Sequence, residues 1–313
     1  MSTLLFPGQG SQIVGMGSEF YNKFKIVKEI FSQADQKLNY SLSKIILEGS
    51  EDKLTLTQNT QPAILTVSYS IFEVLKNEFD FDLNSFKFFS GHSLGEYTAL
   101  VCAKSLEFED AVYLLHERGK AMQNAVPIGR GSMIAILGNK IDDIKNLIDS
   151  RKNKDGVCEI ANDNAEGQVI ISGDKESINS FQTELKQKKI KFLPLKVSAP
   201  FHCSLMKPAA DIMKEKINKT DFKAPKYPIV NNVNALPETD PAKIKDLLYE
   251  QIFSTVRWRE SLINISKNGI SDFIEIGPGK VLSGMVKRTL KNANSFSINS
   301  ITDINNLINE FKK

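Results

Sequence analysis

Ser93 is the residue whose surroundings point most directly to covalent chemistry. It lies within residues 91–95, which read Gly-His-Ser-Leu-Gly and form a Gly-x-Ser-x-Gly motif. An apolar run over 86–89 precedes the motif and a helical run over 97–103 follows it, so the predicted context is strand, tight turn and helix. In that context the motif is typical of a nucleophile elbow, whose glycines leave room for a strained turn that projects the serine hydroxyl from the start of a helix. The alternative is a solvated serine in a plain glycine-flanked turn.

A serine hydroxyl needs a neighbouring base before it can attack a carbonyl at neutral pH. The chain contains three histidines, His92, His116 and His202. His92 adjoins Ser93, so on a tight turn we expect its side chain to point away and to be packed and hydrogen-bonded. His116 lies in a predicted helix beside charged residues and could be at the surface. His202 lies in a turn at a predicted domain junction, where loops commonly carry chemistry, and is therefore the predicted base.

The order of these residues argues against an α/β-hydrolase, in which the histidine comes last. No histidine follows His202, although strands are predicted at 227–230 and 272–276. No acidic residue is an evident partner of His202, so a backbone carbonyl could orient the imidazole by accepting a hydrogen bond from Nδ1. Arg118 could bind a substrate carboxylate through two parallel hydrogen bonds if it reaches Ser93. A surface arginine in a charged helix is the alternative, and composition alone favours it.

The elements that must position these residues alternate between strand and helix. An apolar strand over 3–6 runs into a loop with glycines on both sides of Gln9, which would let backbone N–H groups approach a reacting centre. Apolar residues recur at helical spacing over 18–38, 41–56 and 63–79, and the segment 59–62, Asn-Thr-Gln-Pro, is predicted to start the third helix. The alternation predicts an α/β fold with a parallel sheet.

The pattern changes over residues 130–197. Strands and helices there are predicted in the order β-α-β-β-α-β, which is typical of a ferredoxin-like unit; they span 132–137, 141–152, 157–162, 168–172, 175–189 and 191–197. We therefore predict a large α/β catalytic domain formed by residues 1–129 and 198–313, with an inserted ferredoxin-like subdomain over 130–197.

Composition restricts the class of protein. The 313 residues are 41% hydrophobic and 25% charged, as in an ordinary soluble globular protein. A net charge of +3 does not suggest nucleic-acid binding, although it permits a local basic patch. Cys102, Cys158 and Cys203 are scattered, which predicts neither disulfides nor a metal site and favours a reducing compartment. No signal peptide or membrane span is predicted, so we expect a cytoplasmic protein.

Eight short motifs are spread in order along almost the whole chain: Phe6-Pro7-Gly8-Gln9-Gly10-Ser11-Gln12, Thr60-Gln61-Pro62-Ala63, Gly91-His92-Ser93-Leu94-Gly95-Glu96-Tyr97, Glu117-Arg118-Gly119-Lys120, Gly167-Gln168-Val169, Phe201-His202, Val256-Arg257-Trp258 and Glu275-Ile276-Gly277-Pro278-Gly279. Together they resemble one enzyme family, the malonyl-CoA:acyl carrier protein transacylases of bacterial-type fatty acid synthesis. A single such segment is weak evidence, whereas the ordered set is specific.

The resemblance implies a role for each matching residue. Ser93 would be the nucleophile that carries the malonyl group, and His202 its base and later its acid. Arg118 would pair with the malonyl carboxylate. The other implied positions are Gln9 and Leu94 for the backbone N–H groups of the oxyanion hole, Gln251 for the carbonyl that orients His202, and Asn162, Phe201 and Gln61 for the pocket. In related polyketide synthase acyltransferases, phenylalanine before the catalytic histidine accompanies malonyl, so Phe201 suggests malonyl because it would crowd a methyl branch.

The resemblance also implies the reaction partners. The substrates would be malonyl-CoA and a phosphopantetheinylated, acidic acyl carrier protein, with no permanently bound cofactor or metal and with a monomeric enzyme. Lys287 and Arg288 are candidates for docking the carrier, although a solvated helix face explains them equally well.

Three other functions stay open at this point. A thioesterase or esterase would form the same acyl-serine and release it to water. A non-catalytic module that only binds the carrier protein would need none of Ser93, His202 and Arg118. A domain cut from a polyketide synthase is disfavoured because the chain carries no linker-like sequence.

Overall fold

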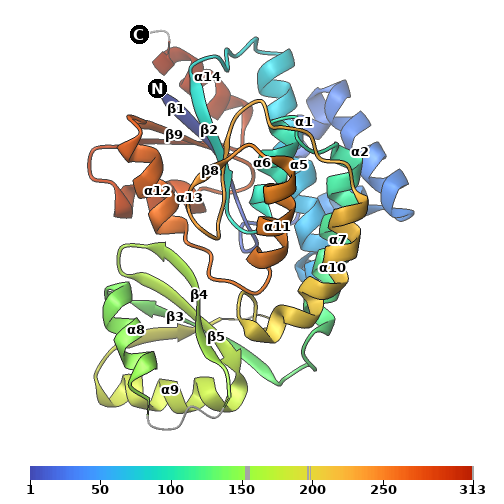
Figure 1. Ribbon diagram of the computed structural model, residues 1–313. Helices are drawn as coiled ribbons and strands as arrows, with labels where there is room; N and C mark the ends of the chain where they lie inside the picture. The colour runs from blue at the N-terminus through green and yellow to red at the C-terminus, as the bar shows by residue number, and fades with distance from the viewer. Residues whose placement is uncertain (152–155, 196, 198, 312–313) are drawn as a thin grey trace.

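The computed structural model describes residues 1–151, 156–195, 197 and 199–311. Its strands form two sheets, one of six strands and one of four (Figure 1). The six-stranded sheet has the order β10-β9-β1-β2-β7-β8, and all of its pairings are parallel except the last. Its strands are β1 (Ser2–Phe6), β2 (Phe86–Gly91), β7 (Ile229–Val230), β8 (Pro237–Glu238), β9 (Asp272–Ile276) and β10 (Asn294–Ile298). The predicted α/β fold with a parallel sheet is therefore confirmed.

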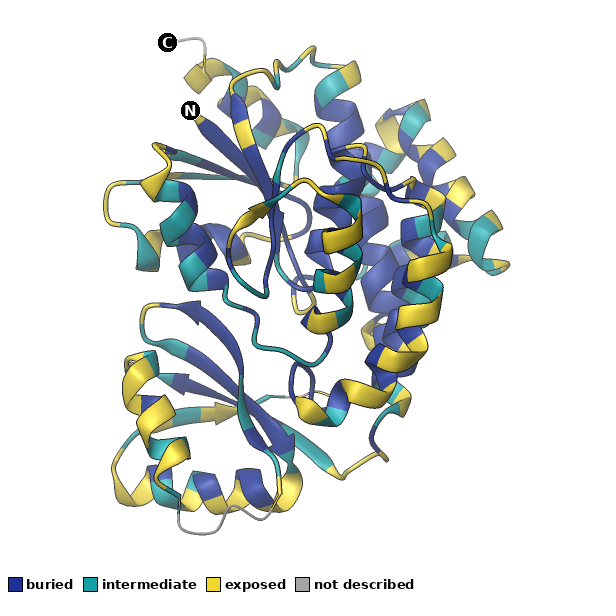
Figure 2. Cartoon of the chain, viewed as in Figure 1, coloured by how far each residue is buried: buried dark blue, intermediate teal, exposed yellow. Residues whose placement is uncertain are grey.

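Both faces of this sheet are covered, as the near-continuous apolar runs of its strands require. In β1, Leu4 and Phe6 pack into the core beneath the helices of the first half of the chain, whereas Leu5 packs on the opposite face with Trp258. The blue and cyan helices of Figure 1 lie on the first side of the sheet, and the helices over 258–267 and 281–289, labelled α12 and α13, lie on the second. Figure 2 shows the same arrangement as a dark, buried sheet inside a shell of partly exposed helices.

The helices around the large sheet are mostly short, and the longest is α5. They are α1 (Ser18–Lys23), α2 (Lys25–Leu38), α3 (Leu42–Glu48), α4 (Glu51–Thr55), α5 (Thr57–Asn77), α6 (Gly95–Cys102), α7 (Phe108–Asn124), the 3₁₀ turn η1 (Ser204–Met206), α10 (Lys207–Lys219), α11 (Pro241–Gln251), α12 (Trp258–Lys267), α13 (Val281–Thr289) and α14 (Ile301–Phe311). No helix in the described part of the chain combines the length and the apolar character needed to cross a membrane.

The start of α5 differs from the prediction. The helix begins at Thr57, so Pro62 lies inside it and 59–62 is not its start. A proline at this position removes the hydrogen bond that its N–H would donate to the carbonyl of Gln58. That carbonyl instead accepts a hydrogen bond from Nδ1 of His116 on α7, over 3.1 Å. A partner from a neighbouring helix therefore compensates the break, which no local sequence rule could reveal.

Two other predicted helices are divided. The segment 18–38 forms α1 and α2, separated by Phe24 in an extended conformation, and 41–56 forms α3 and α4. The ring of Phe24 stacks on that of Phe20 at a centroid distance of 6.3 Å, so packing holds the break. Helical periodicity continues across both breaks, which is why the sequence predicts single helices.

The four-stranded sheet belongs to the segment predicted as the insertion, and its elements follow the predicted β-α-β-β-α-β order. They are β3 (Gly131–Leu137), α8 (Ile141–Asp149), β4 (Cys158–Ala165), β5 (Gln168–Asp174), α9 (Lys175–Gln187) and β6 (Lys191–Pro194). The sheet order is β4-β5-β3-β6 and every pairing is antiparallel. The last strand ends at Pro194 rather than 197, and Lys152 and Lys196 from the predicted elements lie outside the described residues.

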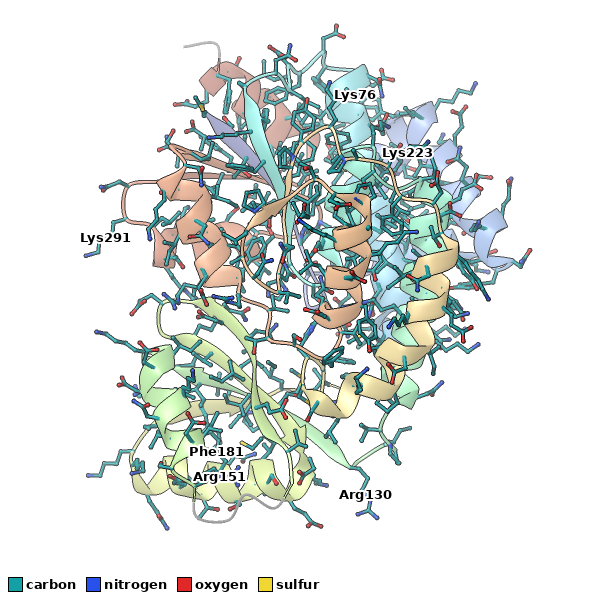
Figure 3. The ribbon with its side chains drawn as sticks, in the orientation of Figure 1. Lys76, Arg130, Arg151, Phe181, Lys223 and Lys291 are labelled. Atoms are coloured by element: carbon teal, nitrogen blue, oxygen red, sulfur yellow. The ribbon has the colours of Figure 1, made fainter. Side chains whose placement is uncertain are left out.

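This smaller unit has a core of its own. Ile134, Ile171 and Phe181 are among the side chains that fill the space between its sheet and the helices α8 and α9. At its far side the guanidinium of Arg151 lies 5.5 Å from the ring centroid of Phe181, and Figure 3 labels both residues. In Figure 1 the opposite side of the unit faces the large sheet. A separate core supports the prediction of a distinct subdomain, while the exact boundaries stay a prediction.

Candidate active site

Ser93 lies on a strained turn between β2 and α6. Its φ of 53° is in the left-handed region, which a residue with a side chain adopts only under constraint. The flanking glycines are required by space: a Cβ on Gly91 would lie 1.9 Å from the carbonyl oxygen of Gly95, and one on Gly95 would lie 2.2 Å from that of Phe6. The side-chain oxygen of Asn232 accepts a hydrogen bond from the N–H of Ser93 over 2.7 Å. The turn is thus held from both sides, and the hydroxyl projects into a buried site.

His202 lies against this hydroxyl. Its Nε2 is 2.8 Å from Oγ of Ser93, and its Nδ1 is 2.8 Å from the backbone oxygen of Gln251. Because a carbonyl can only accept, Nδ1 carries the proton and Nε2 has its lone pair directed at the hydroxyl. No carboxylate contacts the imidazole among the described residues. The carbonyl of Gln251 therefore fixes the tautomer that a general base requires.

The electrostatics of the site keep His202 neutral. Burial, together with the nearby positive charge of Arg118, lowers its pKa to about 3. His202 is only 5% exposed, so water stabilises its charged form poorly. A neutral histidine accepts a proton readily only when the charge that it acquires is compensated, and an anion beside Arg118 would remove part of the repulsion.

Arg118 reaches Ser93 from α7 and is buried, so the surface-arginine interpretation is wrong. Its Nη2 donates to Oγ of Ser93 over 3.1 Å and to Oε1 of Gln251 over 2.8 Å, and its Nη1 donates to Oε1 of Gln61 over 2.7 Å. The guanidinium also lies 5.8 Å from the ring centroid of Tyr97. Its Nε has no protein partner among the described residues. Because the guanidinium of Arg118 is hydrogen-bonded only to neutral oxygens, it can bind an anion.

One cavity of about 370 Å³ contains the candidate site. Every residue predicted for the site lines it except Gln251; the lining set is Gln9, Gln61, Ser93, Leu94, Arg118, Asn162, Phe201 and His202. Asn162 comes from β4 and other lining residues, such as Met133 and Ile170, from β3 and β5. The smaller unit thus forms one wall of the cavity and the large sheet carries the reactive side chains.

The positions expected to supply oxyanion donors lie where strands end. Gln9 follows β1 and Leu94 caps α6, and the two strands β1 and β2 are paired, so their carboxyl ends meet. Gly8 approaches the elbow closely, because a Cβ there would lie 2.7 Å from the backbone oxygen of His92. Within the described residues, neither the N–H of Gln9 nor that of Leu94 donates to a protein acceptor. Both are therefore available to an oxygen bound in the cavity.

The remaining histidines lie away from the hydroxyl. Nε2 of His92 donates to Oδ1 of Asn164 over 2.8 Å, and burial lowers the pKa of His92. As expected for a packed, hydrogen-bonded histidine, it links the elbow to β4. His116 contacts the carbonyl of Gln58 and is half-buried, so it serves the contact between α5 and α7 and is not a fully exposed residue.

Several buried polar residues of the site were not predicted from the sequence. Asn232 holds the N–H of Ser93, and Glu96 accepts hydrogen bonds from Asn232 and Gln251. Two signals could have indicated them. Glu96 is a carboxylate in an otherwise apolar helix, and Asn232 follows β7, the strand beside β2, at the same edge of the sheet. In the described part of the chain, no group of three or more His, Cys, Asp or Glu side chains is arranged to hold a metal ion.

Comparison with known proteins gives one consistent result. The model of the acyl transferase domain family matches residues 3–308. A malonyl CoA-acyl carrier protein transacylase of Bacillus subtilis is 42% identical over 310 residues, covering 99% of this chain and 96% of the relative.

Solved structures agree with that result. The acyl-carrier-protein S-malonyltransferase of Bartonella henselae superposes with a TM-score of 0.95 at 39% identity, covering 100% of this chain and 99% of that one. A malonyl-transacylase solved in complex with its type II polyketide synthase acyl-carrier protein gives a TM-score of 0.94 at 36% identity, covering 99% of both chains. The chain therefore belongs to the acyl transferase domain family, and within it to the malonyl CoA-acyl carrier protein transacylases.

Proposed function

We propose that the protein transfers a malonyl group from malonyl-CoA to the phosphopantetheine thiol of an acyl carrier protein, through a malonyl ester on Ser93. The observation that carries this proposal is the position of Oγ of Ser93, which lies 2.8 Å from Nε2 of His202 and 3.1 Å from Nη2 of Arg118. A base activates the hydroxyl from one side, and a guanidinium beside it can hold a carboxylate. The transfer supplies malonyl groups for fatty acid synthesis.

In the first half-reaction, Oγ of Ser93 attacks the thioester carbonyl while Nε2 of His202 takes the hydroxyl proton. The carbonyl oxygen becomes an oxyanion, which the backbone N–H groups of Gln9 and Leu94 would stabilise. One such donor contributes about two to three powers of ten in rate. The tetrahedral intermediate then collapses, the carbon–sulfur bond breaks, and the imidazolium returns its proton to the leaving CoA thiolate. The products are the malonyl ester and free CoA.

The second half-reaction repeats these steps in reverse. The carrier thiol gives its proton to His202 and attacks the ester carbonyl, and the Ser93 oxygen leaves with that proton. Because one thioester is exchanged for another, the overall free-energy change is small. The covalent ester divides the transfer into two similar half-reactions. Donor and acceptor bind in turn, so ping-pong kinetics are expected.

Arg118 supports malonyl as the acyl group. Its guanidinium is buried and its protein partners are the neutral oxygens of Gln61, Gln251 and Ser93. A malonyl carboxylate can replace the amide oxygens with charge-assisted hydrogen bonds, which are stronger than neutral ones. An acetyl group offers no such partner. Phe201, which is buried in the cavity wall beside His202, would further restrict branching next to the thioester.

The carrier protein is the proposed second substrate. The related malonyl-transacylase solved with its acyl-carrier protein supports this choice. Lys287 and Arg288 are exposed near the end of α13, and Arg288 contacts Gln168 at the start of β5, so an acidic partner could dock across both units there. We also infer a cytoplasmic location, which the free thiols of Cys102, Cys158 and Cys203 support because intracellular compartments keep thiols reduced. The monomeric state is inferred from the family resemblance alone.

Transfer measured beside hydrolysis tests the proposal. Radiolabelled malonyl-CoA is incubated with the protein, with and without phosphopantetheinylated acyl carrier protein, and label is followed on the carrier and as free malonate. Label on the carrier that exceeds free malonate supports transfer. Free malonate as the main product in the presence of carrier would instead identify a thioesterase, and no loss of malonyl-CoA would leave only a carrier-binding module.

A further inference from the structure

Glu96 is a buried carboxyl group that the proposed mechanism does not use. It lies in the first turn of α6, three residues after Ser93, and is 2% exposed. Its Oε2 accepts hydrogen bonds from the backbone N–H of Asn232 over 3.0 Å and from Nε2 of Gln251 over 2.8 Å. A buried carboxyl is costly unless it has partners of this kind. Its two partners are the residues that hold the rest of the site.

Asn232 fixes the backbone of the elbow. Its side-chain oxygen accepts from the N–H of Ser93 over 2.7 Å, and its Nδ2 donates to the carbonyl of Gly91 over 2.8 Å. One amide thus holds both ends of the strained turn that presents the hydroxyl. The hydrogen bond between its own N–H and Glu96 ties that amide to α6.

Gln251 fixes the other two functional groups. Its backbone oxygen accepts from Nδ1 of His202, and its side-chain oxygen accepts from Nη2 of Arg118 over 2.8 Å. Its Nε2 donates to Glu96 and also to the carbonyl of Ser93, over 3.1 Å. Because the amide can donate to Glu96 only in one orientation, the carboxyl determines which end of Gln251 faces Arg118.

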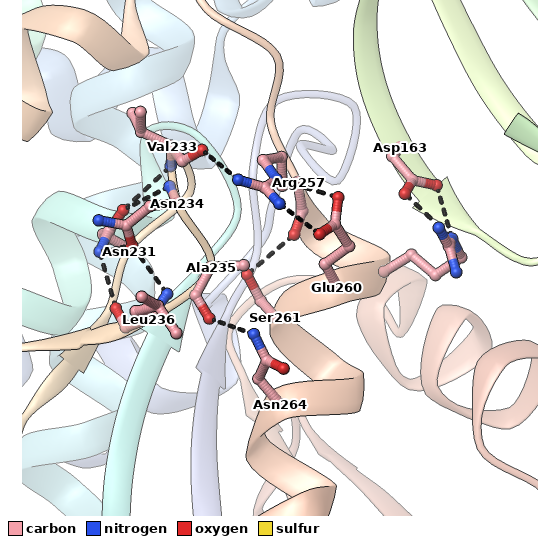
Figure 4. Close-up of polar contacts among 11 residues, drawn as sticks. Asp163, Asn231, Val233, Asn234, Ala235, Leu236, Arg257, Glu260, Ser261 and Asn264 are labelled. Carbon is pink, nitrogen blue, oxygen red and sulfur yellow. Dashed lines mark hydrogen bonds and ion pairs between the residues drawn. The ribbon is translucent and has the colours of Figure 1, made fainter. Parts of the chain in front are cut away.

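The loop that carries Asn232 has supports that do not involve Glu96. Oδ1 of Asn231 accepts from the N–H groups of Val233 and Asn234 over 3.1 and 3.0 Å, and Arg257, paired with Glu260, reaches the carbonyl of Val233 (Figure 4). Loss of Glu96 should therefore disturb the amide contacts of the site without unfolding this loop.

Charge gives Glu96 a second connection to Arg118. The ionisable groups that interact with it are Arg118 from α7 and Tyr97 from α6. The cavity of the site also contains His92 from the elbow and His202 from the turn before η1. Burial raises the pKa of Tyr97 to about 12 and lowers those of both histidines, so these three are neutral near pH 7. Burial likewise raises the pKa of Glu96 to about 7, against the hydrogen bonds from Gln251 and Asn232 and the charge of Arg118. Glu96 is thus the group that can balance the guanidinium.

We propose that Glu96 is a positioning residue that holds Ser93, His202 and Arg118 in register through Asn232 and Gln251, and that it takes up a proton from solvent when the substrate carboxylate binds Arg118. This inference rests on the proposed function. Above about pH 7 the resting site contains one buried cation and one buried carboxylate, so an incoming carboxylate adds an uncompensated negative charge. Protonation of Glu96 restores the balance and leaves a carboxylic acid that still accepts both hydrogen bonds.

The proton uptake predicts a pH effect on selectivity. Because the protonated form of Glu96 favours the anion, the ratio of kcat/KM for malonyl-CoA to that for acetyl-CoA should fall as pH rises through about 7, by up to about tenfold per pH unit. His202 and Ser93 act on both substrates alike, so the ratio isolates the carboxylate response. In Glu96→Gln, which keeps an acceptor oxygen but carries no charge, the ratio should not change with pH.

Two further variants separate position from charge. Glu96→Ala removes the acceptor and should lower acylation by both substrates by about a hundredfold, as expected for misplaced reacting groups. The matched control is Glu275→Gln, since Glu275 is an equally buried carboxylate that accepts from the N–H groups of Leu282 and Ser283 in α13. That variant should retain the wild-type dependence of the ratio on pH.

A wild-type ratio that is constant between about pH 6 and 9 would overturn the inference, and it does not require any variant to fold. The same follows if Glu96→Gln keeps the wild-type pH dependence, or if Glu275→Gln loses it. A wild-type protein that forms no malonyl ester at any pH would refute the proposed function itself, which distinguishes the two failures.

Discussion

Nη2 of Arg118 donates a hydrogen bond to the Oγ of Ser93, the same atom that faces the imidazole of His202. The predicted nucleophile therefore lies between a base and a cation. A cation at 3.1 Å stabilises negative charge that develops on the oxygen during attack. Once the oxygen carries an acyl group, the same cation lies within reach of a carboxylate at the far end of that group. The pair thus joins activation of the hydroxyl to selection of the substrate.

Replacing Ser93 with alanine should abolish covalent loading. After incubation with malonyl-CoA, intact mass spectrometry should show one malonyl group on the wild type and none on Ser93→Ala, because no other hydroxyl faces His202 among the described residues. Ser90→Ala is the matched control, since Ser90 is buried in β2 and its hydroxyl bonds to the carbonyl of Val230. A malonyl adduct on the Ser93 variant would place the nucleophile elsewhere.

Replacing Arg118 should lower the reaction with malonyl-CoA more than the reaction with acetyl-CoA. A hydrogen-bonded charge pair contributes about 1.5–3 kcal/mol, so Arg118→Ala should lower kcat/KM for malonyl-CoA by about 10- to 100-fold more than for acetyl-CoA. Arg118→Lys keeps the charge but not the planar pair of donors, so its preference for malonyl-CoA over acetyl-CoA should lie between those of the wild type and Arg118→Ala. Stopped-flow measurement of CoA release with each substrate gives the values. Equal losses for both substrates would exclude the carboxylate role.

The neutral, buried state of His202 predicts acid instability. Its pKa is about 3 when folded, below the ordinary value of 6.5, so the unfolded state binds the proton more readily. The stabilising contribution is therefore complete above pH 6.5 and is lost as pH falls toward the folded value. Lowering the pH from about 7 to about 5 should therefore reduce the free energy of unfolding by about 2 kcal/mol through His202 alone.

Urea unfolding of the wild type and His202→Gln at both pH values measures that effect. Glutamine does not titrate, so the variant should lose less stability over the same interval. Because burial also lowers the pKa of His92, part of the wild-type loss should persist in the variant. An identical loss in both proteins would show that His202 is already able to hold a proton in the folded state.

Gly95 should tolerate no side chain. A Cβ there would lie 2.2 Å from the backbone oxygen of Phe6, so Gly95→Ala must displace either the elbow or the end of β1. We expect a loss of about 1–3 kcal/mol or more, with a fall in acylation because both the nucleophile and the loop carrying Gln9 would move. Gly284→Ala is the control, since a Cβ at that helical position meets nothing within 4 Å and should stabilise the protein by up to about 1 kcal/mol. Thermal unfolding of the two variants measures both effects. A Gly95→Ala variant as stable as Gly284→Ala would show that the Cβ at position 95 causes no steric clash.

The sequence predicts those parts of this protein that depend on local pattern. The elbow around Ser93 follows from glycine spacing between a strand and a helix, and the parallel sheet follows from alternating elements. His202 could be inferred because few histidines compete for the role. Arg118 could be named, but its burial could not be derived from a helix whose neighbours in the sequence are charged.

The supporting residues depend on contacts between distant segments. Asn232 and Glu96 are far apart in sequence and meet because β7 pairs with β2. The start of α5 was mispredicted for a similar reason, since a contact from another helix offsets the cost of Pro62. Buried polar groups follow no periodicity, and their partners become evident only when the sheet order is known.

The proline that interrupts α5 has a consequence for the substrate pocket. The carbonyl that it leaves free is bound by His116 of α7, and Gly119 of α7 lies so close to α5 that a Cβ would be 2.5 Å from the carbonyl oxygen of Thr57. On α7, Arg118 lies between these two contacts and donates a hydrogen bond to Gln61, one turn further along α5. The distance between the two helices is therefore set by the hydrogen bond that Pro62 cannot donate and by the side chain that Gly119 lacks. Replacing Pro62 or Gly119 should shift α7 relative to α5 and so change how tightly Arg118 binds the carboxylate, although neither residue contacts it.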